Sequence, residues 1–465
     1  MCAHHETPRT RGHLVRDDDG IEELENAMET LENTLQDLGN DAAYRIGSAV
    51  LKIRRDTDYL KGDVSRLRED LTGLWDFVQG RNEGHRLTTV SSRNEIGNVK
   101  ERLLYIDNLR LMIVTFVVMH HLAVTYSGFG SWYYVEGTHL DTLSTVWFAF
   151  YLSFQQGYFM GLMFMIAGYF VAGSYDRKGF GRFVGERFRR LIIPSLIYMV
   201  AITPFIAFVE LGNKVTGFSI IGFLSGTGVM WFAVALFVFS LIYGLVRLIV
   251  RRPAPASDRK QLELSLTKAI ILILIISVSA FLIRIVQPIG TSILNMQLCY
   301  FASYIVLFIV GIIAYRNNLF ARISYRTGKK WLISGIALGF LTWLPLAIVV
   351  TESGTIAALI GGLTWQNATY SLWESFVAVA MSIGLIAVFR EKFNHQSKLA
   401  KTLSDNSYAV YMFHPLIIIP VTLLLKPVAL YPIVKWLMLC VICVPLCFAA
   451  THFVFRKIPL LKNVL

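Results

Sequence analysis

The sequence has few charged residues and few cysteines for its length. Only 16% of the 465 residues are charged, whereas 54% are hydrophobic. A soluble globular protein carries roughly a quarter charged residues. This composition excludes a soluble enzyme of two or three domains, and it is too apolar for an intrinsically disordered chain. Five cysteines in a chain of this length also exclude a disulfide scaffold.

The cysteines offer no metal-binding pattern. Cys440, Cys443 and Cys447 follow one another at spacings of three and four residues in an apolar run, so they share one face of a helix. A metal site would need further histidine or carboxylate ligands in that run, and the run has none. We interpret the three as small apolar residues at a helix contact, and we expect no metal.

Acidic residues are scarce in the C-terminal part of the chain. Residues 1–100 hold 14 basic and 19 acidic residues, whereas residues 101–465 hold 30 basic and 13 acidic residues. The net charge of +12 therefore reflects basic loops between apolar segments, and it does not indicate nucleic-acid binding. No long apolar run precedes Leu109, so a secretory signal peptide is not expected.

Ten apolar segments follow the first hundred residues, and each is long enough to cross a bilayer as a helix. They lie at about 109–126, 146–173, 191–210, 229–249, 269–288, 296–315, 331–351, 371–389, 407–425 and 436–455. The expected fold is therefore all-α. It is a polytopic membrane helix bundle of about ten transmembrane helices over residues 101–465, with an N-terminal cytosolic coiled coil or helical hairpin.

Loops rich in Lys and Arg alternate with loops that have almost none. The start of the first segment, every second loop and the C-terminal tail together hold 26 basic residues. The remaining loops hold only Lys214, Lys426 and Lys435. Because positively charged loops stay in the cytoplasm, we expect both termini there. The sequence thus predicts a multi-pass protein of the plasma membrane.

The first hundred residues form a separate cytosolic region. Residues 1–20 are polar and expected to be disordered, and residues 81–100 are rich in Gly, Ser, Asn and Arg, as linkers are. Residues 21–80 carry apolar residues at alternating spacings of three and four, which is typical of coiled coils. The helices either fold on each other at Gly39–Asn40 as a hairpin or pair between chains as a homo-oligomer. In both cases we expect a packing module without chemistry.

Several polar side chains lie inside the predicted spans, where they are unfavourable unless they are paired or face a wet cavity. The set comprises His120, His121, Gln155, Gln156, Arg284, Asn295, Gln297, Glu374, Tyr408, Tyr411 and His414. The simplest arrangement that accommodates them is a polar cavity inside the bundle, reachable from both sides of the membrane.

Arg110 and His121 are eleven residues apart, which is about three helical turns. Their side chains then lie on one helix face, roughly 16 Å apart along the axis, while His120 is turned about 100° away. Such a face suits a long phosphorylated donor that enters from the cytoplasm with its reactive end pointing inward. Alternatively, Arg110 snorkels to the surface and His121 is a hydrogen-bonded core histidine.

The motifs that hold these residues resemble those of the membrane acyltransferase-3 family. Arg110, ten residues and His121 are similar to the family's signature on its first span, and Arg187-Phe-Arg189-Arg190 resembles its Arg-x-x-Arg motif. Trp231 resembles the tryptophan at the start of the fourth span. Residues 371–374 and 407–415 resemble the subgroup that includes glucan-biosynthesis succinyltransferases. The resemblance covers roughly residues 101–460.

The resemblance implies an integral membrane O-acyltransferase. Such an enzyme moves an acyl group, of acetyl or succinyl type, from cytosolic acyl-CoA to a hydroxyl of an extracytoplasmic carbohydrate. Acyl-CoA is the donor substrate, and no tightly bound cofactor is implied. Arg110, Arg187 and Arg190 are then expected to contact the CoA phosphates. His121 is expected to accept the proton of the attacking hydroxyl, or to carry the acyl group itself.

Further residues are expected to contact substrate. Glu374 is predicted to orient the acceptor or His121, or else to pair with Arg284 as a carboxylate at the rim. Trp231, Arg284, Tyr411 and His414 are candidates for substrate binding. His414 precedes a proline, and its simplest interpretation is a helix-packing residue.

Three other functions fit parts of the pattern. A transporter or flippase for an envelope glycan or other polar solute would share the spans and the polar interior, although no inverted repeat is visible. A haem-bearing electron carrier would need paired axial histidines, and only His120, His121 and His414 lie deep in spans. A scaffold organised by the coiled coil would not need the two arginine motifs.

Overall fold

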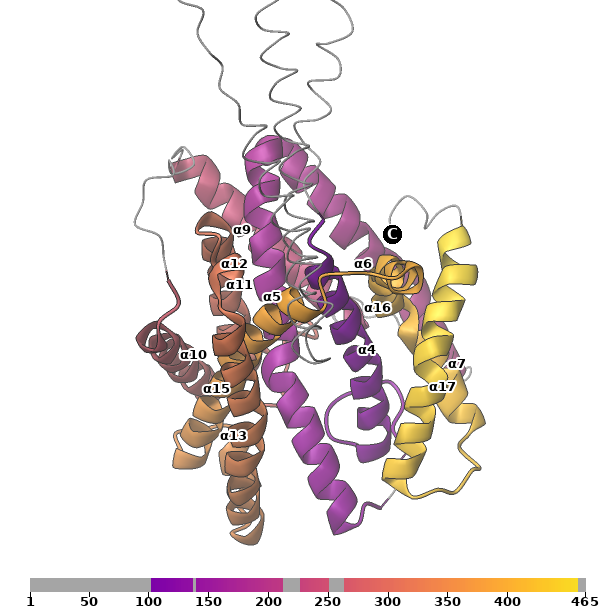
Figure 1. Ribbon diagram of the computed structural model, residues 1–465. Coiled ribbons are helices and arrows are strands. Elements are labelled where there is room, and N and C mark those ends of the chain that lie inside the picture. Colours follow the sequence, from indigo (N-terminus) through magenta and orange to yellow (C-terminus); the bar gives the residue numbers. More distant parts are fainter. Residues whose placement is uncertain (1–101, 137–138, 212–225, 251–262, 459–465) are drawn as a thin grey trace, which may run out of the picture. The chain divides into compact units, whose positions relative to one another are not determined.

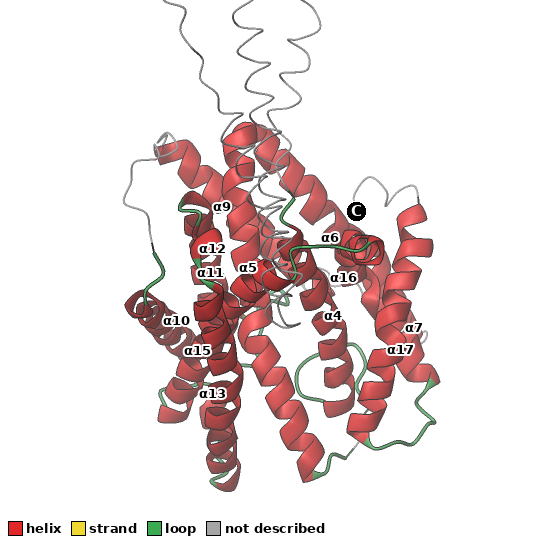
Figure 2. Cartoon of the chain, viewed as in Figure 1, coloured by secondary structure: helices red, strands yellow, loops and turns green. Residues whose placement is uncertain are grey.

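The computed structural model describes residues 102–136, 139–211, 226–250 and 263–458. Within these ranges the regular elements are helices, and apart from one isolated bridge between Ile293 and Met296 no β-structure is formed (Figure 2). The prediction of an all-α bundle is confirmed. The expected disordered N-terminus, heptad helices and linker of residues 1–100 lie outside the described residues.

The helices follow the chain in the order that Figure 1 shows. The α-helices are α4 (Leu104–Ser127), α5 (Thr142–Arg187), α6 (Ile193–Ile197), α7 (Thr203–Leu211), α9 (Trp231–Val250), α10 (Leu266–Val286), α11 (Phe301–Arg316), α12 (Leu319–Arg322), α13 (Tyr325–Glu352), α14 (Ile356–Ile360), α15 (Trp365–Lys392), α16 (Lys398–Leu424) and α17 (Pro432–Phe453). Two π-helical turns, η1 (Phe188–Ile192) and η2 (Tyr198–Ile202), interrupt the third predicted span. Short 3₁₀ turns are η3 (Gly228–Met230), η4 (Leu298–Tyr300) and η5 (Phe455–Lys457).

Nine helices in the described ranges are long and apolar enough to cross a membrane, compared with ten predicted segments. The difference arises because one stretch of 67 residues, Thr142–Phe208, holds two of the segments. Gly179 divides this stretch, since its φ of 70° and ψ of 173° are not helical and suit glycine. Figure 1 shows the ribbon turning back at the upper end of α5. The loop expected at 174–190 is therefore helical on both sides of a single glycine.

The bundle is built around α15. Of the apolar, membrane-crossing stretch of α15, 78% is buried inside the protein, compared with 28% for α13. Helix α15 packs against α4, α5, α10 and α13. The backbones of α5 and α11 approach each other closely at two glycines. A Cβ atom added at Gly168 would lie 2.1 Å from the carbonyl oxygen of Phe308, and one at Gly311 would lie 2.0 Å from that of Met165. Small residues permit this close approach between membrane helices.

Large apolar side chains cover the outward faces of the peripheral helices. Ile249, Val286, Leu341 and Val441 are each more than 60% exposed. Exposed apolar side chains in such number are unfavourable in water, whereas lipid tails accommodate them. Together with the helix lengths, these side chains fit a multi-pass membrane protein.

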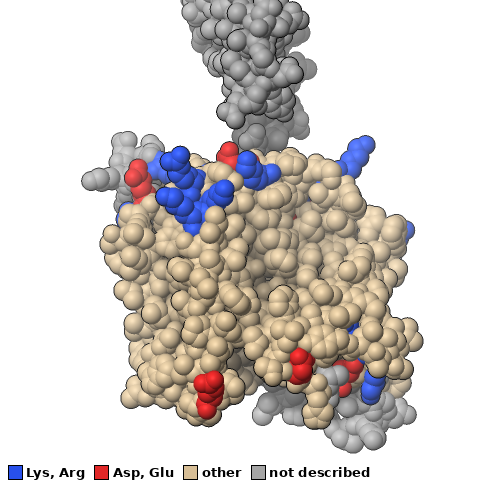
Figure 3. Space-filling view, turned by 60° about the horizontal axis from the view of Figure 1, so that its bottom comes forward, with Lys and Arg blue, Asp and Glu red and all other residues tan. Residues whose placement is uncertain are grey.

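One end of the bundle, which we call the basic end, is joined by ion pairs of Arg102, Arg247 and Arg316. Arg247 and Arg316 both pair with Asp176, and Arg102 pairs with Asp405 at 2.7 Å. The loops predicted to share the cytoplasm therefore meet at the same end. Figure 3 shows most of the visible Lys and Arg side chains near one edge of the molecule, above a wide zone that is mostly uncharged.

Candidate active site

The histidine of the first span meets the histidine of the ninth. His121 Nδ1 on α4 lies 2.8 Å from His414 Nε2 on α16, and the two rings are nearly parallel, at 10°. His414 is fully buried. Its other ring nitrogen, Nδ1, lies 2.9 Å from the carbonyl oxygen of Tyr411 and 3.2 Å from that of Val410. Within the described residues, His121 Nε2 has no hydrogen-bond partner.

His120 faces a different helix, as the helical spacing predicts. Its ring stacks on Phe159 of α5, with centroids 5.1 Å apart, and stands almost perpendicular to the ring of His121. The two adjacent histidines therefore have separate surroundings, and only His121 contacts His414.

Trp132 lies over the histidine pair, a position that no local feature of the sequence indicates. Its ring stacks on His121 at 3.9 Å and is parallel to His414 at 5.9 Å. Trp132 belongs to the loop that follows α4, where Gly128 ends the helix in a left-handed conformation with φ 69°. This turn folds the loop back toward the helix that it has just left.

The loop that carries Trp132 is fastened at several points. The amide of Glu136 donates to the carbonyl of Thr125, and its carboxylate pairs with the buried Lys435 of α17 at 2.5 Å. Tyr133 and Tyr198 share a hydrogen bond of 2.8 Å between their hydroxyls. The stacked position of Trp132 is thus held by contacts with α4, η2 and α17.

Three arginines gather near the basic end. Arg110 lies 3.7 Å from Asp107 and packs over the ring of Phe170, while Arg187 packs over Phe183. Arg187 lies within electrostatic range of Arg110, of Arg190 and of the carboxylate of Glu186, which itself forms an ion pair with Lys178. Across the described residues, no carboxylate forms an ion pair with Arg187 or Arg190. Neighbouring cations that lack carboxylate partners create a positive potential that favours anions.

A π-helical turn shapes the arginine motif. Arg190 lies in η1, directly after Arg187 at the end of α5. The hydroxyl of Tyr408 on α16 donates to the carbonyl of Arg190 at 2.8 Å, which links this turn to the helix that holds His414. π-Helical turns are rare and often mark functional sites.

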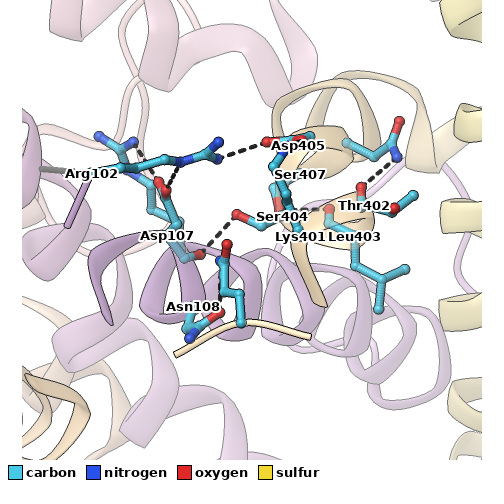
Figure 4. Close-up of polar contacts among 12 residues, drawn as sticks. Arg102, Asp107, Asn108, Lys401, Thr402, Leu403, Ser404, Asp405 and Ser407 are labelled. Carbon is cyan, nitrogen blue, oxygen red and sulfur yellow. Dashed lines mark hydrogen bonds and ion pairs between the residues drawn. The ribbon is translucent and has the colours of Figure 1, made fainter. Parts of the chain in front are cut away.

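Arg102, unlike Arg187 and Arg190, forms ion pairs with carboxylates. Figure 4 shows its guanidinium between Asp107 and Asp405, with Ser404 bonded to the backbone of α4 beside them. These hydrogen bonds, that of Asp405 first, raise the pKa of Arg102 above its usual value. Its charge is engaged by carboxylates, so this network ties α4 to α16 and does not present an anion site.

Glu374 is paired away from the histidines. Its carboxylate lies 2.5 Å from the guanidinium of Arg284, which also donates to Ser371 at 3.1 Å. Both ions are almost completely buried. Within the described residues, Glu374 has no hydrogen bond to His121. The expected alternative of an Arg284 pair is therefore what forms, and a catalytic role for Glu374 stays a prediction.

The remaining predicted substrate contacts stabilise the fold around the site. The hydroxyl of Tyr411 donates to the carbonyl of Val229, just after the left-handed Gly228. Trp231 stacks against Tyr304 at 5.8 Å and is only partly buried. Neither contacts His121, so their binding roles also stay predictions.

The described residues contain no group of three or more His, Cys, Asp or Glu side chains that is arranged to hold a metal ion. Cys440, Cys443 and Cys447 are buried and free, as expected of residues at a helix contact. His121 and His414 hydrogen bond directly at 2.8 Å, which leaves no room between them for a haem iron.

Comparison with known proteins identifies the family of the chain. The model of the acyltransferase-3 family, described as an acyltransferase domain, matches residues 103–452, which include every helix from α4 to all but the end of α17. No curated protein and no solved structure matches the chain. The chain therefore belongs to the acyltransferase-3 family and is a membrane acyltransferase that transfers groups other than amino-acyl groups.

Proposed function

We propose that this protein transfers an acyl group, of acetyl or succinyl type, from cytosolic acyl-CoA to a hydroxyl of a carbohydrate on the other side of the plasma membrane. The observation that carries the proposal is the histidine of α4, which has one ring nitrogen held by His414 and the other without a partner, on the helix that also carries Arg110. Both termini are then expected in the cytoplasm, as is the basic end of the bundle.

The arginine cluster supports a phosphorylated donor. Arg187 and Arg190 have no carboxylate partner in the described part of the chain, and Arg110 is only partly engaged by Asp107. Arginine binds phosphate through paired, charge-assisted hydrogen bonds. The pantetheine arm of CoA separates its phosphates from the thioester. A donor held by this cluster would therefore extend along α4 toward His121, roughly 16 Å further along the axis.

The surroundings of His121 support a polar acceptor. One buried atom beside it, Trp132 Nε1, has no hydrogen-bond partner in the described residues. Buried polar groups normally have one. A hydroxyl-rich ligand supplies such partners, and an aromatic ring such as that of Trp132 offers an apolar face on which a sugar can rest.

In the proposed reaction, His121 acts as general base. The acceptor oxygen bonds to the thioester carbonyl carbon while His121 Nε2 takes the hydroxyl proton. The C–S bond then breaks, and the CoA thiolate leaves with that proton, so the products are an ester and free CoA. In the acyl-histidine alternative, the same Nε2 attacks the thioester first and the acceptor hydroxyl displaces the histidine.

The test uses the full-length protein in lipid nanodiscs with acetyl-CoA or succinyl-CoA and soluble glucan oligosaccharides. We expect glucan-dependent release of free thiol, and an ester of matching mass on the glycan by mass spectrometry. His121→Ala should abolish both signals, whereas His139→Ala, which changes an exposed loop histidine, should retain them. In proteoliposomes of the same protein, glycan movement into the vesicles without thiol release or ester formation would instead support a transporter.

A further inference from the structure

We propose that His414 is a positioning residue that fixes the tautomer of His121, so that the unpaired Nε2 of His121 carries a lone pair directed away from α16. The inference rests on the proposed function, in which that lone pair accepts the proton of the acceptor. It assigns His414 a role in the chemistry, in place of substrate binding or simple helix packing.

The arrangement begins with the proline that follows His414. In an α-helix the carbonyl of residue i accepts a hydrogen bond from the amide of residue i+4. For Tyr411 that residue is Pro415, which lies inside α16 and has no amide hydrogen. The Tyr411 carbonyl is thus left without its helical donor. His414 Nδ1 lies 2.9 Å from it, and a carbonyl can only accept, so Nδ1 carries the hydrogen.

The second step follows from the two tautomers of a neutral imidazole. With hydrogen on Nδ1, the Nε2 of His414 is an acceptor. His121 Nδ1 lies 2.8 Å from this atom and must donate to it. His121 then has its hydrogen on Nδ1 and its lone pair on Nε2. A backbone carbonyl exposed by a proline therefore determines, through one intervening ring, which nitrogen of His121 is basic.

Packing holds the two rings in the plane that this hydrogen bond requires. The ring of Trp132 lies within 12° of parallel to His121 and within 9° of parallel to His414, and the two imidazoles are themselves 10° apart. His414 is fully buried, so water does not compete for its nitrogens. Rotation of either ring would break the hydrogen bond and the stacking together.

The pair also assists the reaction after proton uptake. When Nε2 of His121 takes the hydroxyl proton, the ring becomes a cation with hydrogen on both nitrogens. Its Nδ1–H then donates a charge-assisted hydrogen bond to the neutral Nε2 of His414. No proton needs to move to His414, and the cation returns its proton from Nε2 to the leaving thiolate.

The first experiment compares three substitutions of His414 in the full-length protein. In His414→Gln the amide oxygen can take the place of Nε2 as acceptor, whereas the shorter His414→Asn does not reach His121, and His414→Leu has no acceptor. We expect kcat to fall about a hundredfold in the Asn and Leu variants, with KM for acyl-CoA unchanged, and to recover at least tenfold in the Gln variant. Equal kcat in folded Gln and Asn variants, or unchanged kcat in the Leu variant, would overturn the inference.

The second experiment needs no variant of His414. Nitrogen-15 NMR of histidine-labelled wild-type protein in lipid distinguishes protonated from unprotonated ring nitrogens. We expect both rings to carry hydrogen on Nδ1, with the His121 signals identified by their loss in His121→Ala. Hydrogen on Nε2 of either ring overturns the inference even if acyl transfer is observed. Absence of acyl transfer in the wild type, with the expected tautomers present, would instead reject the proposed function.

Discussion

Two buried polar pairs join helices in this protein, and they differ in what they leave available. The Arg284–Glu374 pair between α10 and α15 is charged, bonds to Ser371, and lies between the rings of Tyr300 and Tyr370. The His121–His414 pair between α4 and α16 leaves one ring nitrogen of His121 without a protein partner in the described residues. The charged pair leaves Arg284 Nε and Glu374 Oε1 without a hydrogen-bond partner in the described residues, but its two charges compensate each other. The histidine pair instead leaves a neutral ring nitrogen that can accept a proton.

The two pairs represent two roles for polar residues in a membrane, one in folding and one in turnover. A buried ion pair contributes little net stability, but removal of one partner is costly because the other charge stays buried. A neutral imidazole pair carries no such penalty. Substitutions should therefore affect folding at the first pair and turnover at the second.

The largest expected effect is at His121. His121→Ala should lower turnover about a thousandfold, because it removes the proposed base, while the protein still inserts and purifies. The measurement is thiol release at saturating acyl-CoA, together with thermal unfolding of the purified variant. His120→Ala should retain most activity, since His120 faces Phe159. A strict requirement for His120 and none for His121 would show that the helix-face argument is wrong.

At the charged pair the expected loss is one of stability. Glu374→Leu should destabilise the protein by about 3–5 kcal/mol, because it leaves Arg284 buried without a counter-ion. The double variant Arg284→Met with Glu374→Leu should recover much of that loss, measured by thermal unfolding in detergent. Glu374→Gln keeps an acceptor for Arg284. If that variant folds normally but loses turnover as His121→Ala does, Glu374 takes part in the chemistry and the distinction between the pairs fails.

An intermediate effect is expected at the basic end. Arg187→Ala and Arg190→Ala should each weaken acyl-CoA binding by roughly ten- to a hundredfold, the equivalent of about 1.5–3 kcal/mol for a charge-assisted contact. The Lys variants should recover only part of it, because a point charge does not reproduce the planar guanidinium. Arg182→Ala, an exposed change in the same region, is the matched control. Unchanged binding in both alanine variants would remove these residues from the donor site.

A smaller effect is expected at Trp132. Trp132→Ala uncovers His121 and removes the stacking that aligns the two imidazoles. Hydrolysis of acyl-CoA without acceptor should rise severalfold relative to transfer, because water then reaches the site more easily. Trp147→Ala, which changes a more exposed tryptophan on α5, is the control. An unchanged ratio of hydrolysis to transfer would mean that Trp132 does not cover the site.

The smallest effect on chemistry is expected from removal of residues 1–95. Every candidate site residue lies after position 100, so turnover should be retained, with the remaining basic loops preserving topology. The truncated protein should be smaller by light scattering if the heptads pair between chains. Loss of turnover in a correctly inserted truncated protein would mean that this region gates or supplies the donor.

Only part of the site can be predicted from the sequence. The eleven-residue spacing places Arg110 and His121 on one face, and helical periodicity turns His120 away from it. His414–Pro415 was also visible as a dipeptide, and the missing amide at Pro415 predicts an unpaired carbonyl at Tyr411. The contact of the His414 ring with the Tyr411 carbonyl could be predicted from the proline, but the pairing of His414 with His121 on another helix could not.

The sequence by itself determined the helices, the apolar segments and the sidedness of the basic loops, because hydropathy, helical period and loop charge belong to contiguous residues. Only the tertiary structure decided that His121 meets a residue 293 positions away, that Trp132 covers both rings, and that Glu374 pairs with Arg284. These contacts depend on how helices cross and on the close approach permitted at positions such as Gly168. No local property of the chain specifies which distant side chain will lie opposite.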